Sequence, residues 1–271
     1  EHAVEIEKGE LEAKPRSSVE FIVKASGIQQ RFAYVKEGIL DIERMRPRFA
    51  ERPEEVLSDQ AEMAVAAARE AMAAANKTAE DIDAVIVSCA YTQRAYPAIA
   101  IEVQNELGIE GFGFDMNVAC SSATFGFQQA CSLIESGAAN SVLVVNPEIC
   151  TAHLNFCDRD SHFIFGDVAT AMLVERADAR QKSSDRASFE ILGTRLRTQF
   201  SNNIRNNHGF LSRVEAESHD ALRDRLADAE TDLLFKQEGR MVFLLEDAIL
   251  ETVTTRMVTI RPRIEQICFL S

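Results

Sequence analysis

A short and nearly continuous apolar segment, residues 83–90, places the strongest constraint on the fold. It reads Asp-Ala-Val-Ile-Val-Ser-Cys-Ala. Such a run is typical of a strand covered on both faces, because a strand with one solvated face alternates apolar and polar residues. Residues 112–119 predict a second buried strand. Further apolar runs predict strands at residues 141–145, 169–174 and 189–197.

Helical patterns alternate with these strands. Ser58 is a typical N-cap for the Ala-rich stretch that runs to Ala75, where Asn76 can end the helix. Residues 36–57 contain prolines among mixed charges, so we expect an irregular segment there. Strands that alternate with helices predict an α/β sheet with right-handed crossovers. The predicted helices cover residues 17–24, closed by Gly27, then 58–75, 98–107 and 122–136, closed by Gly137, and one from about Leu233.

Composition excludes several classes of function. The 271 residues carry a formal net charge of −14, which disfavours non-specific nucleic-acid binding. No segment approaches the ~20 apolar residues of a membrane helix. The six cysteines form no Cys-x-x-Cys pair, which excludes the zinc-ribbon and thioredoxin-like classes, and we expect no metal site. Without a membrane segment or a signal-peptide pattern, we expect a cytoplasmic location. The chain starts at Glu1 without a signal-peptide pattern, and we expect the natural amino terminus to lie upstream.

Cys120 is the residue with the most informative surroundings. It stands where the predicted strand 112–119 gives way to the predicted helix 122–136. The unpaired N–H groups and the dipole at a helix N-terminus favour an anion, so we expect a lowered thiol pKa. The same N–H groups can stabilise an oxyanion, and the small residues after Cys120 leave room for an acyl chain. A buried structural cysteine at a strand–helix turn is the alternative that these residues leave open.

The segment around Cys120, residues 114–127, resembles the nucleophile motif of the β-ketoacyl-acyl-carrier-protein synthase III family, which has a thiolase fold. The resemblance covers roughly residues 17–243 and implies an α/β, thiolase-like layered αβαβα fold, mainly its first half. Four further segments resemble family motifs in the same order. They are Ser26-Gly27-Ile28 with Arg31, Ala95-Tyr96-Pro97-Ala98, Asp158-Arg159 with Ile164-Phe165-Gly166-Asp167, and Gln237-Glu238-Gly239-Arg240-Met241-Val242-Phe243.

The resemblance implies an acyltransferase of fatty acid biosynthesis. Cys120 would accept the acyl group of an acyl-CoA primer, and the acyl-enzyme would condense with malonyl-acyl-carrier protein as carbon dioxide is lost. The product would be a 3-oxoacyl-acyl-carrier protein, formed without a cofactor. Residues 119–126, together with Asn146-Pro147-Glu148, are similar to a branch that uses medium-chain primers. The family also implies a homodimer that binds acyl-CoA and acyl carrier protein.

Four substrate-binding residues follow from the resemblance. Arg159 matches an arginine that contacts the CoA nucleotide, although a surface salt bridge is the alternative. Phe21 stands in place of a tryptophan that stacks on the CoA base, and a core phenylalanine is an equally good interpretation. Tyr96 matches a residue that crosses the dimer interface to close the partner's acyl pocket; the alternative is a packed loop aromatic. Phe165 belongs to the Phe-Gly-Asp signature.

His153 and His162 are the histidines nearest to these motifs, but neither matches the family's catalytic histidine, and we expect both to be structural. The family's histidine and asparagine come from its second half. No His-Gln-Ala-Asn-like or Asn-Thr-Ser stretch is present, and the last histidine is His219. We therefore expect residues 1–232 to form the N-terminal thiolase-like half with the nucleophile, and residues 233–271 to begin a truncated or divergent C-terminal half.

Three interpretations of this missing half stay open. The preferred one is a truncated or incompletely recorded synthase, because half of a thiolase fold alone exposes an apolar face. The second is a subunit completed by another polypeptide, and the third is a non-catalytic relative that binds acyl groups or partners. Outside the synthase class, a Cys-dependent thioester hydrolase or a scaffold without chemistry is also compatible with the residues.

Overall fold

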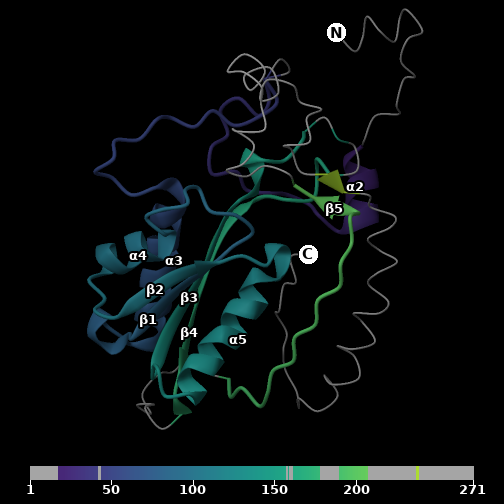
Figure 1. The fold of residues 1–271 in the computed structure, drawn as a ribbon. Coiled ribbons are helices and arrows are strands. Elements are labelled where there is room, and N and C mark those ends of the chain that lie inside the picture. Colours follow the sequence, from purple (N-terminus) through teal and green to yellow (C-terminus); the bar gives the residue numbers. More distant parts are fainter. Residues whose placement is uncertain are drawn as a thin grey trace, which may run out of the picture.

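The structure is a computed structural model that describes residues 18–41, 44–156, 158, 161–177, 189–206 and 236–237. Its centre is a four-stranded sheet with helices on both faces (Figure 1). The predicted α/β class is therefore confirmed. The four strands are β1 (Ala84–Ser88), β2 (Phe112–Met116), β3 (Ser141–Ile149) and β4 (Asp167–Glu175).

The strand order is β2-β1-β3-β4. β1 is parallel to both β2 and β3, with Ala84 opposite Phe112 on one side and Val142 on the other. β4 instead runs antiparallel to β3, and the described residues of the connection between them form a short turn, η3 (Cys150–Ala152), and no crossover helix. The sheet is thus mixed, with parallel strands on one side and one antiparallel pair on the other.

The helices begin and end close to the positions that the sequence predicts. Their bounds are α2 (Val19–Ser26), α3 (Asp59–Ala75), α4 (Ile99–Leu107) and α5 (Ser122–Glu135). Ser58 caps α3 by accepting the N–H of Ala61 at 3.2 Å, and Asn76 ends the helix in the left-handed conformation. Two further short turns are η1 (Ala79–Asp81) and η2 (Ala119–Ser121).

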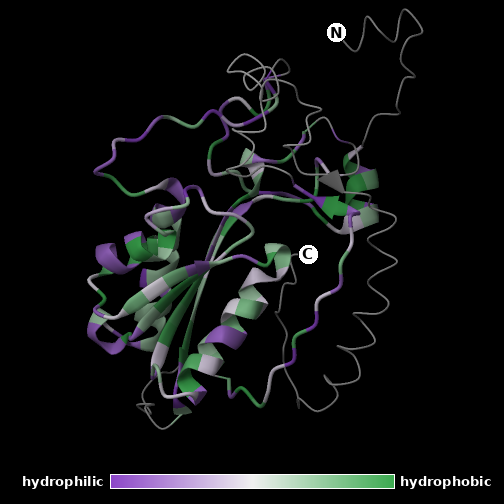
Figure 2. Ribbon diagram, in the orientation of Figure 1, coloured by the Kyte–Doolittle hydropathy of each residue, from purple (hydrophilic) through white to green (hydrophobic). Residues whose placement is uncertain are grey.

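Alternate residues of the central strands pack against different helices. Val85 and Val87 face α3 and α4, whereas Ile86 faces α5 on the other side of the sheet. β3 follows the same period of two, since Leu143 and Val145 join the first core, whereas Val142 and Val144 join the second. Burial of each such side chain stabilises the fold by about 1.5–3 kcal/mol. The strands accordingly form the hydrophobic centre of Figure 2.

Two strand predictions need correction. β2 is not buried on both faces: Phe112 is exposed and the rest of the strand is only half-buried, because β2 lies at the edge of the described sheet. The predicted strand at residues 189–197 is wrong, since these residues are exposed and form no strand. A two-residue pairing follows instead, between β5 (Ile204–Arg205) and β6 (Lys236–Gln237).

The predicted last helix, from about Leu233, is wrong at its start, because Lys236 and Gln237 form strand β6. The rest of it lies outside the described residues, so the boundary between residues 1–232 and 233–271 stays a prediction. Within the described part of the chain, none of the helices combines the length and the apolar character needed to cross a bilayer.

Candidate active site

Cys120 lies at the carboxyl edge of the parallel strands. β1, β2 and β3 run in one direction, so the segments that follow them meet at this edge (Figure 1). Cys120 is the middle residue of η2, and α5 begins two residues later at Ser122. The residue is exposed. The predicted place of the thiol, between the second strand and the following helix, is confirmed.

Two side chains hold the turn that carries Cys120. Asn117 accepts the N–H of Ala119 through Oδ1 at 2.9 Å and donates from Nδ2 to the carbonyl of Ala90 at 2.6 Å. The hydroxyl of Ser122 accepts the N–H of Val118 at 2.8 Å and lies 2.7 Å from the carbonyl oxygen of Ala119. These contacts maintain Ala119 at a φ of 48°, a left-handed conformation that is costly for any residue with a Cβ atom. The backbone before the thiol is therefore strained and held in place.

The end of β3 is tied to the end of β1 by two further polar side chains. Asn146 donates from Nδ2 to both the carbonyl and the hydroxyl oxygen of Ser88, each at 2.7 Å. Glu148 accepts the N–H of Ala90 through Oε1 at 2.6 Å. Its Oε2 is buried and has no hydrogen-bond partner within the described ranges. Burial raises the pKa of Glu148 to about 7, against the effect of the Ala90 hydrogen bond.

The pKa of Cys120 corrects our expectation from the sequence. Loss of solvation around the sulfur raises this pKa, the negative charge of Glu148 raises it further, and only a backbone hydrogen bond lowers it. The position before α5 therefore does not by itself produce a thiolate. Cys150 shows the same pattern: burial raises its pKa first, with contributions from Glu148, Asp167 and Cys120. The charged group that acts on Cys120 is thus the carboxylate of Glu148, which the sequence motif did not indicate.

Asp167 connects two motifs that are far apart in the sequence. Its N–H donates to the carbonyl of Phe32 at 2.8 Å, and its Oδ2 accepts the N–H of Tyr34 at 2.8 Å. Next to it, Arg31 donates from Nη1 to the carbonyl of Phe165 at 2.6 Å. Gly166 leaves no space for a Cβ atom, which would lie 2.8 Å from the Phe32 carbonyl oxygen. The early Gly-Ile-x-x-Arg segment and the Phe-Gly-Asp segment are therefore one structural unit.

The remaining predicted site residues lie on separate segments. Phe21 is 52% exposed on α2, and Tyr96 is 86% exposed in the loop before α4. These exposures disfavour the alternatives in which both aromatic rings pack inside the protein. Phe165 is half-buried. Arg159 lies outside the described residues, so its contact with CoA stays a prediction.

The two histidines that we expect to be structural make aromatic contacts. His153 packs edge-on against Tyr91 with 4.7 Å between ring centroids, and its Nδ1 lies 3.1 Å from Nδ2 of Asn206. His162 packs edge-on against Phe163. No group of histidine, cysteine and carboxylate side chains suited to a metal ion is found in the residues that the structure describes.

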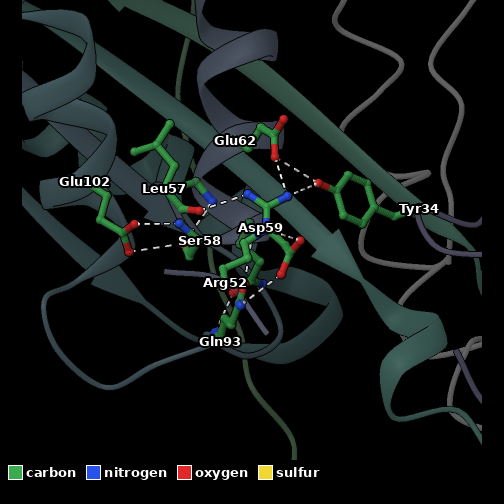
Figure 3. Close-up of polar contacts among 10 residues, drawn as sticks. Tyr34, Arg52, Leu57, Ser58, Asp59, Glu62, Gln93 and Glu102 are labelled. Carbon is green, nitrogen blue, oxygen red and sulfur yellow. Dashed lines mark hydrogen bonds and ion pairs between the residues drawn. The ribbon is translucent and has the colours of Figure 1, made fainter. Parts of the chain in front are cut away.

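A cavity of about 410 Å³ opens beside the N-terminus of α3. Its wall includes Arg52, which pairs with Asp59 at 2.9 Å and with Glu62 at 2.5 Å (Figure 3). Tyr34 joins this network through its hydroxyl group, which donates to Glu62 and accepts from Arg52. The network fixes the irregular segment before α3 to the first turn of the helix. Its polar groups satisfy one another in hydrogen bonds and ion pairs.

Comparison with known proteins adds the context for Cys120. The family described as 3-Oxoacyl-[acyl-carrier-protein (ACP)] synthase III matches residues 114–198, which include Cys120. A Beta-ketodecanoyl-[acyl-carrier-protein] synthase of Pseudomonas aeruginosa is 59% identical over 243 residues, which are 90% of this chain and 66% of that protein. A Beta-ketoacyl-[acyl-carrier-protein] synthase III of Granulibacter bethesdensis is 37% identical over 138 residues, 51% of this chain and 42% of that protein. The chain thus spans two thirds or less of the length of these relatives.

Solved structures show the same fold. A 3-oxoacyl-(acyl-carrier-protein) synthase III aligns with a TM-score of 0.65 at 23% identity over 88% of this chain and 64% of that chain. The corresponding enzyme of Pseudomonas aeruginosa aligns with a TM-score of 0.64 at 21% identity over 89% of this chain and 61% of that chain. The predicted thiolase-like fold is confirmed. With its motifs, fold and identities in agreement, the chain belongs to the 3-oxoacyl-[acyl-carrier-protein] synthase III family.

Proposed function

We propose that the protein condenses an acyl-CoA primer with malonyl-acyl-carrier protein in fatty acid biosynthesis. The observation that carries this proposal is the exposed Cys120 in a strained turn at the carboxyl edge of the sheet, within the segment that matches the family. The thiolate would attack the thioester carbonyl of the primer, forming acyl-Cys120 and releasing CoA. Decarboxylation of the malonyl group would then provide the carbanion that attacks the acyl-enzyme.

The primer that we propose is a medium-chain acyl group. The relative with 59% identity is named for a β-ketodecanoyl product. Since malonyl condensation adds two carbons, such a product requires an octanoyl primer. The small residues after Cys120, Ser121 and Ser122 with Ala123, are compatible with a chain of this size. The acyl length therefore follows from the relative's name and is open to a direct test.

The binding roles of the other predicted residues are part of the same proposal. Phe21 and Arg159 would bind the CoA nucleotide, the first by stacking and the second by charge. Tyr96 would close the acyl pocket of a partner in a homodimer, which agrees with its exposure in the isolated chain. The reaction needs no cofactor. We place it in the cytoplasm, because all cysteines that the structure describes are free thiols.

The test is incubation of residues 1–271 with octanoyl-CoA, followed by intact mass measurement. We expect a stable octanoyl adduct on the wild-type chain and none on Cys120→Ala, with Cys131→Ala as a control that keeps the nucleophile. Cys131 is a suitable control because it is buried on the sheet side of α5. Rapid release of free octanoate without an adduct would favour thioester hydrolysis, and the absence of both would favour a scaffold.

The second half of the reaction separates the remaining interpretations. Because residues 1–271 contain no segment that matches the family's histidine and asparagine motifs, we expect no 3-oxodecanoyl product when malonyl-acyl-carrier protein is added to the acylated chain. Product formed by this chain alone would show that those motifs are not needed. Product formed only after addition of a second polypeptide would support the subunit interpretation.

A further inference from the structure

The backbone of Ala90 joins side chains from two different segments. Its N–H donates to Oε1 of Glu148 at 2.6 Å, and its carbonyl accepts from Nδ2 of Asn117 at 2.6 Å. Asn117 in turn accepts the N–H of Ala119, the residue before Cys120. A continuous chain of hydrogen bonds therefore runs from Glu148 to the turn that carries the thiol.

Glu148 is an unusual anchor for such a chain. Its second carboxyl oxygen, Oε2, is buried and makes no hydrogen bond to any residue that the structure describes. A buried polar atom without a partner costs about 1–3 kcal/mol, so a side chain that only held Ala90 would be better served by a group without this oxygen. Costly buried acids of this kind concentrate at functional sites.

The titratable groups around Glu148 come from every neighbouring segment. Cys89 and Tyr91 follow β1, Cys120 is in η2 and Cys150 begins η3, and the charge of Glu148 raises the pKa of each of the four. Behind them, Asp115 acts on Cys89, and Asp167 acts on Tyr91 and Cys150. No lysine or arginine of the described ranges pairs with the Glu148 carboxyl. Its charge is therefore felt by the thiol without a compensating cation.

We propose that Glu148 is a positioning residue for the nucleophile, which holds the Cys120 turn through Ala90 and Asn117 and sets the thiolate fraction of Cys120 by its charge. The inference rests on the proposed role of Cys120 as the nucleophile. The pKa of Glu148, raised to about 7, supports it because the carboxyl then changes charge near neutral pH. Below this pH the neutral acid leaves the thiol easier to ionise, and above it the carboxylate opposes ionisation.

The experiment measures alkylation of Cys120 by iodoacetamide in the full chain, from about pH 5.5 to about pH 9.5, by mass spectrometry of the peptide that contains it. Alkylation follows the thiolate fraction. For the wild type, we expect the logarithm of the rate to rise linearly with pH both below and above pH 7. The line above pH 7 should be parallel to the line below it but displaced to lower rates, because Glu148 is then charged. Glu148→Gln keeps an acceptor for the Ala90 N–H but has no charge, so we expect a single line and a rate about threefold higher above pH 7.

Glu106→Gln is the matched control, because Glu106 forms an exposed ion pair with Arg69 on the outer helices. It should give the wild-type profile. Asn117→Ala should keep the displacement near pH 7 and lower the rate of Cys120 acylation by octanoyl-CoA about tenfold, since the turn loses its anchor. Acylation unchanged in Asn117→Ala would overturn the positioning role.

Two further results would overturn the role of the charge. One is a Glu148→Gln profile that superimposes on the wild type. The other is a wild-type profile without displacement near pH 7, which decides the question even where a variant does not fold. Because iodoacetamide needs no acyl-CoA site, failure of acyl transfer with an intact displacement would contradict the proposed function alone.

Discussion

Asp167 accepts both hydrogen-bond donors of Thr151, the backbone N–H at 2.9 Å and the hydroxyl at 2.7 Å. The first residue of β4 is thereby fixed to the turn that follows β3. Because the same carboxylate also accepts the N–H of Tyr34, it faces donors from two separate segments. Because all three of these partners are donors, both terminal atoms of the side chain at position 167 must be acceptors.

The first prediction concerns this group. Asp167→Asn places an NH₂ group against at least one of these donors, so we expect the free energy of unfolding to fall by about 2 kcal/mol. Urea denaturation followed by circular dichroism measures the change. The control is Glu70→Gln on the exposed side of α3, which should change the free energy by less than about 0.5 kcal/mol. Equal stabilities of the two variants would contradict the role of Asp167 as a structural acceptor.

A second prediction concerns the contact between α5 and the sheet. A Cβ atom at Gly126 would lie 2.4 Å from the hydroxyl oxygen and 3.0 Å from the Cβ of Ser88. Gly126→Ala should gain up to about 1 kcal/mol from helix propensity, but the overlap with β1 costs about 1–3 kcal/mol and should prevail.

The outcome of Gly126→Ala is measured as thermal stability and as the rate of Cys120 alkylation, because displacement of α5 moves the turn before it. Gly193→Ala is the matched control, since a Cβ atom added at Gly193 would have no neighbouring atom within 4 Å. If Gly126→Ala were as stable as Gly193→Ala, the close approach of α5 to Ser88 would be refuted.

Sequence reasoning succeeded where a feature is local. Ser58 and Asn76 cap α3 as predicted, since capping depends on the residue and its near neighbours. Sequence reasoning failed for residues 189–197, where an apolar run has no partner strand among the described residues.

Sequence reasoning also missed Glu148 as part of the site. The contact with Ala90 joins residues 58 positions apart and depends on the register of β1 against β3. The acid was visible in the sequence only as a marker of a family branch.

A third prediction separates a role of Tyr96 in assembly from a role in folding. With 86% of its surface exposed, Tyr96 contributes little to the stability of the chain, and Tyr96→Ala should change the free energy of unfolding by less than about 0.5 kcal/mol. If Tyr96 closes the acyl pocket of a partner, the same variant should weaken dimerisation in light scattering and reduce acylation by octanoyl-CoA. Unchanged assembly together with unchanged acylation would contradict that role.

The last prediction concerns the pH dependence of stability. The pKa of Glu148 is raised from 4.5 to about 7 in the folded protein, so the native state keeps the proton over a range in which the unfolded chain has lost it. At low pH the acid is protonated in both states, so its ionisation contributes nothing to the difference in free energy between them. As the pH rises from 4.5 to about 7, the unfolded state gains from ionisation, and the wild type should lose about 3 kcal/mol of stability relative to Glu148→Gln. Urea denaturation of both proteins across this range tests the difference.

Glu106→Gln controls for the loss of a carboxylate at an exposed ion pair. A difference between wild type and Glu148→Gln that stays constant over the range would show that Glu148 ionises as freely in the native state as in the unfolded chain, and its proposed influence on Cys120 would then have no titration near neutral pH.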